Sequence, residues 1–66
     1  MGISFIEASM PFIPTEHLYT IISMCEDDNS EESQRIISIC NENITKRENG
    51  KLYKVLRKGR DVWVEK

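Results

Sequence analysis

The chain has 66 residues, of which 39% are hydrophobic and 30% charged, and its formal net charge is −2. These values are typical of one small globular domain and argue against disorder, while the short length leaves little room for an active-site cleft within the core. No apolar run approaches the roughly 20 residues of a membrane-spanning helix, and the N-terminal segment lacks the basic start of a signal peptide. We therefore expect a single domain over residues 1–66, with no membrane association, in the cytoplasm.

The N-terminal part is predicted to be a strand followed by a helix. Residues 3–7, ISFIE, form a short run of β-type residues. The segment Met10–Pro14 is predicted to be extended or turning, because each proline biases the residue before it away from helical angles. A helix from Glu16 to Glu26 follows, with Thr15 as its N-cap. Its apolar residues recur at the i, i+3, i+4 and i+7 positions of one helix face: Leu18, Ile21, Ile22 and Cys25.

A second helix is predicted from Ser30 to Arg47. Either Asn29 or Ser30 can cap its start, and Asn49-Gly50 is a good stop signal. Two acids at the start of this helix and two bases at its end complement the helix dipole: Glu31, Glu32, Lys46 and Arg47. The expected apolar face consists of Ile36, Ile37, Cys40 and Ile44, with Ile39 beside it.

The C-terminal residues 51–66 are predicted to form a β-hairpin around a Lys58-Gly59 turn, in which Gly59 supplies a positive φ. Alternation places two groups on opposite faces of this hairpin. We expect the helices to pack on the face of Tyr53, Val55, Val62 and Val64, and the outer face to carry Leu52, Leu56 and Trp63 around Lys54. The predicted fold is α+β, in the order β-α-α-β-β, with two helices on one face of an antiparallel sheet.

The sequence offers no catalytic, cofactor-binding or metal-binding motif. Cys25 and Cys40 are too far apart for a metal knuckle, and their expected heights on two antiparallel helices differ too much for a disulfide, so both are predicted to be reduced and buried. His17, the single histidine, has no second ligand or nucleophile near it in sequence. We expect a protein without enzymatic activity and without a cofactor.

Charge is distributed unevenly along the chain. Residues 1–40 carry a net charge of −6 and residues 41–66 a net charge of +4. The helix dipole explains the middle of the chain but not the cations of the hairpin. Two explanations of the hairpin cations are equally well supported. The charges protect exposed strand edges, or they form a contact surface for an anionic partner. The predicted partner-binding residues are Arg57, Lys58, Arg60, Lys54, Trp63, Lys46 and Arg47.

Two functions remain open. The first is a small regulatory protein that binds and modulates another protein, as inhibitors, antitoxins and assembly factors do; such small regulators suggest a phage or other mobile element. The second is a nucleic-acid-binding regulator of minimal winged-helix type, with the basic hairpin as its wing. Four carboxylates around the start of the second helix would repel phosphate, so a protein partner is favoured: Asp27, Asp28, Glu31 and Glu32. Marginal burial and the outer face of the hairpin also predict a homodimer.

Overall fold

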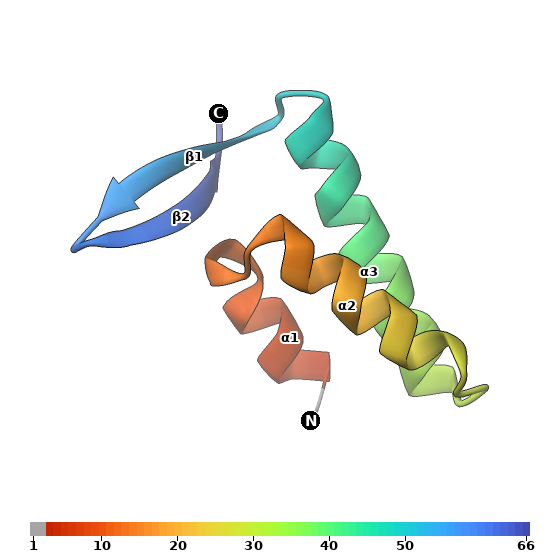
Figure 1. The fold of residues 1–66 in the computed structure, drawn as a ribbon. Helices are drawn as coiled ribbons and strands as arrows, with labels where there is room; N and C mark the ends of the chain where they lie inside the picture. The colour runs from red at the N-terminus through yellow and green to blue at the C-terminus, as the bar shows by residue number, and fades with distance from the viewer. Residues whose placement is uncertain (1–2) are drawn as a thin grey trace.

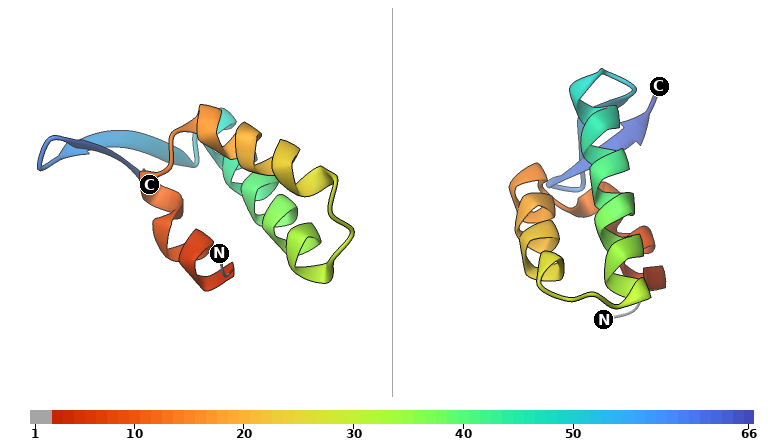
Figure 2. Two further views of the ribbon diagram at one scale, coloured as in Figure 1. Left: turned by 60° about the horizontal axis from the view of Figure 1, so that its bottom comes forward. Right: turned by 90° about the vertical axis from the view of Figure 1, so that its right-hand side faces the viewer.

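The computed structural model describes residues 3–66. It contains the helix α1 (Ile3–Ser9), the short 3₁₀-helix η1 (Met10–Phe12), the helices α2 (Thr15–Glu26) and α3 (Glu31–Glu48), and the strands β1 (Leu52–Arg57) and β2 (Arg60–Glu65). Helices α2 and α3 run side by side in opposite directions, and α1 lies along the same pair (Figure 1). The hairpin projects from the end of α3, which gives the molecule a length of 35 Å (Figure 2).

The prediction of a strand over residues 3–7 is wrong, because these residues belong to α1. Ile6 and Met10 are four residues apart, so a helical turn brings both to one side, where they are 1% and 5% exposed. Burial of these two side chains against the helix pair outweighs the weak strand preference of the β-type residues. The fold is therefore α+β with its helices first, and its sheet consists of the hairpin alone within residues 3–66.

The core lies between the three helices rather than between helices and sheet. Its buried residues come from every helical segment: Ile6, Met10, Leu18, Ile22, Ile36, Cys40 and Ile44. The predicted apolar faces of the two long helices are thus confirmed, and Ile37 and Ile39 pack partly buried beside them. Both cysteines are free, as expected; Cys40 is fully buried and Cys25 half-buried. Burial raises the pKa of the Cys40 thiol, which keeps it protonated and unreactive.

Helix α2 begins one residue earlier than predicted, and its N-cap is Pro14 rather than Thr15. The Pro14 carbonyl accepts hydrogen bonds from the backbone N–H groups of His17 and Leu18, at 2.9 and 3.2 Å. Thr15 is the first helical residue, and its hydroxyl accepts a hydrogen bond from Arg47 instead of capping the helix. The capping prediction failed because a distant partner in α3 competes for this hydroxyl.

Helix α3 is capped by Ser30, one of the two predicted alternatives. The Ser30 hydroxyl accepts a hydrogen bond from the Ser33 backbone N–H at 3.2 Å. Asp28 accepts from the Ser30 N–H at 3.0 Å and from the Ser33 hydroxyl at 2.9 Å. The first of these bonds contributes most to lowering the pKa of Asp28. At the other end the helix runs through Glu48, and Gly50 leaves it with a φ of +83°.

The hairpin does not form a layer beneath the two long helices, so this part of the predicted architecture is wrong. It stands at the end of the helix pair, where β2 contacts η1 and β1 contacts α3. Both faces of the ribbon supply buried residues, Val62 from one face and Leu52 from the other, each 7% exposed. Tyr53, expected on the covered face, is 45% exposed. Two-stranded ribbons twist strongly, which lets either face meet the helices along its length.

Replacing Ile36 with alanine should lower the free energy of unfolding by about 2–5 kcal/mol, because the change leaves a cavity between α2 and α3. Urea denaturation followed by far-UV circular dichroism measures this loss. Ser38→Ala is the matched control, since Ser38 is exposed on the same helix, and its effect should stay within about 0.5 kcal/mol. Equal midpoints for the two variants would contradict the assigned core face.

The pH dependence of stability should report the hydrogen bonds of Asp28. Its pKa is lower in the folded protein than the ordinary value of 3.8, so its stabilising contribution is complete above that value. The contribution disappears as the pH falls through the ordinary value to the lower folded one. The difference in unfolding free energy between the wild type and Asp28→Asn should be constant above about pH 5 and shrink below it. A difference that grows in acid would show that these hydrogen bonds are absent.

Candidate functional site

The hairpin has the predicted register. Arg57 faces Arg60, Leu56 faces Asp61, and the pairing continues to Leu52 opposite Glu65. Lys58 and Gly59 form the turn with φ values of +51° and +76°. Two positive φ values in a two-residue turn match the twist of the flanking strands. This turn therefore fixes which side chains gather at the tip, defined as Leu56 to Arg60.

Arg47 attaches the base of the hairpin to the helices. Its side chain is 8% exposed, and its guanidinium donates to the Thr15 hydroxyl at 2.9 Å and to the Met10 carbonyl at 3.1 Å. The guanidinium carbon also lies 4.6 Å from the centroid of the Trp63 ring, within the range of a cation–π contact. Burial lowers the pKa of Arg47. One side chain of α3 thus binds η1, the start of α2 and strand β2.

Two polar atoms beside this anchor are buried without a hydrogen-bond partner within residues 3–66: Nε of Arg47 and Oδ1 of Asn43. The first is a donor and the second an acceptor, and the two residues are four apart, on neighbouring turns of one helix face. Both atoms therefore belong to the surroundings of the anchor.

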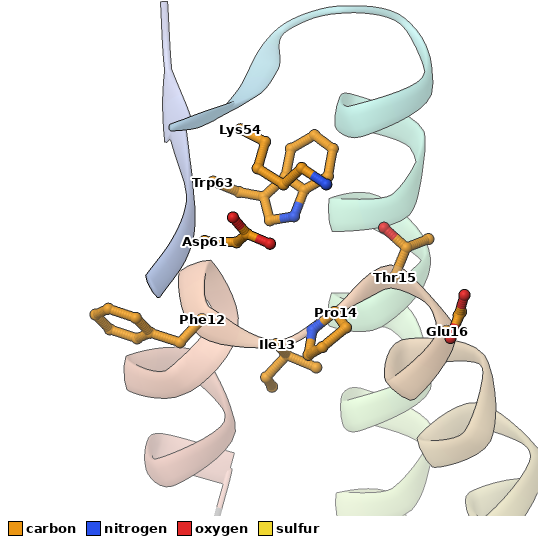
Figure 3. Close-up of a pocket in the computed structure, with 8 residues that line it drawn as sticks. All are labelled: Phe12, Ile13, Pro14, Thr15, Glu16, Lys54, Asp61 and Trp63. Atoms are coloured by element: carbon orange, nitrogen blue, oxygen red, sulfur yellow. The ribbon is translucent and has the colours of Figure 1, made fainter. Parts of the chain in front are cut away.

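A cleft of 240 Å³ lies between the hairpin and the segment from Phe12 to Glu16 (Figure 3). Trp63 and Lys54 form its hairpin side, and the Lys54 ammonium lies 6.0 Å from the centroid of the Trp63 ring. Asp61 and Glu16 also line it. The cleft therefore carries both signs of charge and has no clear preference for an ion of either sign.

His17, the single histidine of the chain, is exposed on α2. Within residues 3–66, no three side chains from His, Cys, Asp and Glu lie together as a group that could hold a metal ion. In the same part of the chain, no helix is both long enough and apolar enough to cross a membrane.

The tip of the hairpin is a separate group of cations. Arg57, Lys58 and Arg60 are all exposed. None of the three forms an ion pair within residues 3–66. Leu56 lies beside them and is 73% exposed. The tip therefore presents one large apolar side chain and three cations without an ion pair in the described residues, with Asp61 opposite Leu56 on the neighbouring strand.

The other predicted partner-binding residues are placed differently. Lys46 lies 3.7 Å from the Glu42 carboxylate and 3.9 Å from that of Glu65, so its charge is balanced within the chain. Arg47 is buried in the anchor, and Trp63 is half-buried against it. Lys54 is exposed at the cleft. The structure thus separates the predicted residues into a base with an internal role and an exposed tip, while Lys54 belongs to neither.

The anchoring role of Arg47 was not predicted, although the sequence contained a signal for it. The buried stripe of α3 continues past its isoleucines with spacings of three and four residues: Ser33, Ile36, Cys40, Ile44 and Arg47. Arg47 therefore lies on the core face, not only in the last turn where it complements the helix dipole. Its partners, the Met10 carbonyl and the Thr15 hydroxyl, are 37 and 32 residues away in sequence and carried no comparable signal.

Comparison of the chain with protein-family models, with curated proteins and with solved structures returned no match.

Replacing Arg47 with lysine should lower the free energy of unfolding by about 1.5–3 kcal/mol, because an ammonium cannot reproduce two charged hydrogen bonds and the stacking on Trp63. Denaturation measures the loss, and the emission of Trp63, the single tryptophan, should shift to longer wavelength. Arg35→Lys is the matched control, since Arg35 makes only an exposed pair with Glu31, worth about 0.5 kcal/mol. Wild-type stability and emission in Arg47→Lys would contradict the anchoring role.

Proposed function

We propose that this protein is a non-catalytic regulator that binds an anionic surface of another protein through the tip of its hairpin. The observation that carries the proposal is the tip itself, in which Arg57, Lys58 and Arg60 are exposed and form no ion pair within residues 3–66. Lys46 and Arg47, in the last turn of α3, support it by contrast, because both are engaged within the chain. The tip lies at the free end of the hairpin, which projects from the body (Figure 1).

The tip is energetically unfavourable for the isolated protein. Lys58 occupies a left-handed backbone conformation, which costs an L-residue with a side chain roughly 1–2 kcal/mol. Arg57 and Arg60 face each other across the ribbon, and like charges in that position are destabilising. Asn-Gly at positions 58 and 59 would make the same turn without the Lys58 charge and at a lower backbone cost, because asparagine adopts left-handed angles more readily. Local costs of this kind concentrate at binding sites, where an anionic partner would offset the repulsion.

Protection of a strand edge explains the tip less well. Edge protection requires charges along the strand, where unpaired backbone groups lie exposed. Arg57 is the last residue of β1 and Arg60 the first of β2, with Lys58 in the turn between them, so these cations stand at the strand ends. The edge-protection interpretation fits Lys54 better, because that residue lies in the interior of β1.

Two observations argue against a nucleic-acid partner. Helices α2 and α3 form a hairpin of side-by-side helices (Figure 2), whereas a DNA-binding helix-turn-helix crosses its helices steeply. The start of α3 also carries Glu31 and Glu32 in its first turn, and these carboxylates would repel phosphate. The winged-helix alternative is therefore retained only as an outcome of the test.

The test is charge reversal of the tip, Arg57→Glu with Lys58→Glu and Arg60→Glu. The variant should retain the wild-type fold because all three side chains are exposed. Affinity capture from the source cell should recover a protein with the wild type, with or without nuclease treatment, and should not recover it with the variant. Measured with the purified partner, the loss should fall mainly on the association rate, which should also decrease with salt.

Lys51→Glu with Lys66→Glu is the matched control, since both residues are exposed at the other end of the hairpin. This control should retain binding. A partner that disappears on nuclease treatment, with a log–log salt slope of about −3 from the three tip residues, would favour nucleic acid instead. Full biological activity of the tip variant would refute the proposal and leave the cations with a structural role.

A further inference from the structure

We propose that the tip of one molecule docks into a groove at the far end of a second copy, so that the protein associates head to tail. This inference rests on the proposed use of the tip as a contact surface and adds a specific occupant for it. The groove has a volume of 360 Å³ and lies where α1, the end of α2 and the start of α3 meet.

The groove has an apolar lining from all three helices, including Ile6, Ile21 and Ile36. Met24 also lines it and is 73% exposed, and its flexible thioether adapts readily to an incoming side chain. Among its other lining residues are Asp28 and Glu32. Asp28 is fixed in place by its hydrogen bonds to Ser30 and Ser33, which also lower its pKa and keep it ionised. The site therefore combines an apolar floor with a negative rim.

The tip has the complementary composition. Leu56 is the large apolar residue of the tip, and it is 73% exposed. Arg57, Lys58 and Arg60 follow it in the sequence and form no ion pair within residues 3–66, while Asp61 faces it across the ribbon. A groove of 360 Å³ accommodates one leucine side chain. Burial of Leu56 would contribute about 1.5–3 kcal/mol, while the long cationic side chains reach the acidic rim.

The two surfaces cannot meet within one molecule. The hairpin tip and the connection between α2 and α3 lie at opposite ends of the molecule, which is 35 Å long, in Figure 1 and in the left view of Figure 2. Two tips repel each other, as do two acidic rims, so a symmetric pairing of like surfaces is disfavoured. Contact between unlike surfaces leaves a free tip and a free groove at the ends, and such contacts form open chains or rings.

This inference replaces the predicted dimer through Leu52, Leu56 and Trp63. Leu52 is 7% exposed and Trp63 packs under Arg47, so these two side chains are engaged within the chain. Only Leu56 of that group remains exposed. Self-association therefore has one apolar residue at the tip available to it, and a groove elsewhere to receive it.

The experiment uses two variants of the full chain. In the first, the tip is neutralised by Arg57→Ser, Lys58→Asn and Arg60→Ser; in the second, the groove is blocked by Met24→Lys and Glu32→Lys, both at exposed positions. In sedimentation equilibrium at about 0.05 M salt, the apparent mass of the wild type should be larger than the monomer mass of 7.7 kDa. This apparent mass should rise as the protein concentration rises. Each variant alone should remain monomeric. An equimolar mixture should form a one-to-one dimer and nothing larger, because it contains one intact tip and one intact groove.

The wild-type association should weaken at about 0.5 M salt, where charges are screened beyond a few ångströms. A wild type that stays at 7.7 kDa at millimolar concentration, a mixture without a dimer, or dimers of the tip variant alone would each overturn the inference. Circular dichroism of both variants identifies a loss of fold, and Leu56→Ala then provides a second test of the tip. A monomeric wild type that still captures a foreign protein would refute head-to-tail association alone, while the proposed function would stand.

Discussion

The buried guanidinium of Arg47 is the interaction on which the arrangement of the whole molecule depends. It projects from the end of α3, donates to the Met10 carbonyl and the Thr15 hydroxyl, and lies against the Trp63 ring. A two-stranded hairpin is marginally stable by itself in water, and outside this anchor the hairpin contributes only Leu52 and Val62 as buried residues. The desolvated charge is costly unless its hydrogen bonds are made, so the helices and the hairpin must take up their relative positions together.

This anchor distinguishes two groups among the cations of the C-terminal region. At the base, Arg47 is engaged with backbone, hydroxyl and indole, and Lys46 lies between the carboxylates of Glu42 and Glu65. At the tip, Arg57, Lys58 and Arg60 have no such partners within residues 3–66. The same residue types therefore have different physical roles, which depend on whether the helices are within reach. Counting basic residues along the sequence could not separate these roles.

The sequence was most informative where the determinants are local. The apolar stripes of α2 and α3, the choice between two caps at Asn29 or Ser30, and the hairpin register around Lys58-Gly59 all depend on residues a few positions apart. It failed where distant contacts decide. Residues 3–7 have strand propensity but form a helix because Ile6 reaches the core between α2 and α3, and Thr15 does not cap α2 because Arg47 engages its hydroxyl. For the candidate site, the exposed tip was anticipated, whereas the burial of Arg47 and the position of the hairpin relative to the helices were not.

The contrast between a fixed base and an unengaged tip also bears on how the hairpin can bind. Buried contacts at Leu52, Val62 and Arg47 hold the ribbon at a defined position relative to the helical body. The turn then sets the tip cations at the end of a paired ribbon rather than on a loose loop. A group held in this way loses less conformational freedom on binding than one on a flexible segment. The tip has two unfavourable features, its like charges and its left-handed lysine. They persist because the base of the hairpin supplies the stability that the tip does not. Under the proposed function, an anionic partner would reduce the repulsion between these charges.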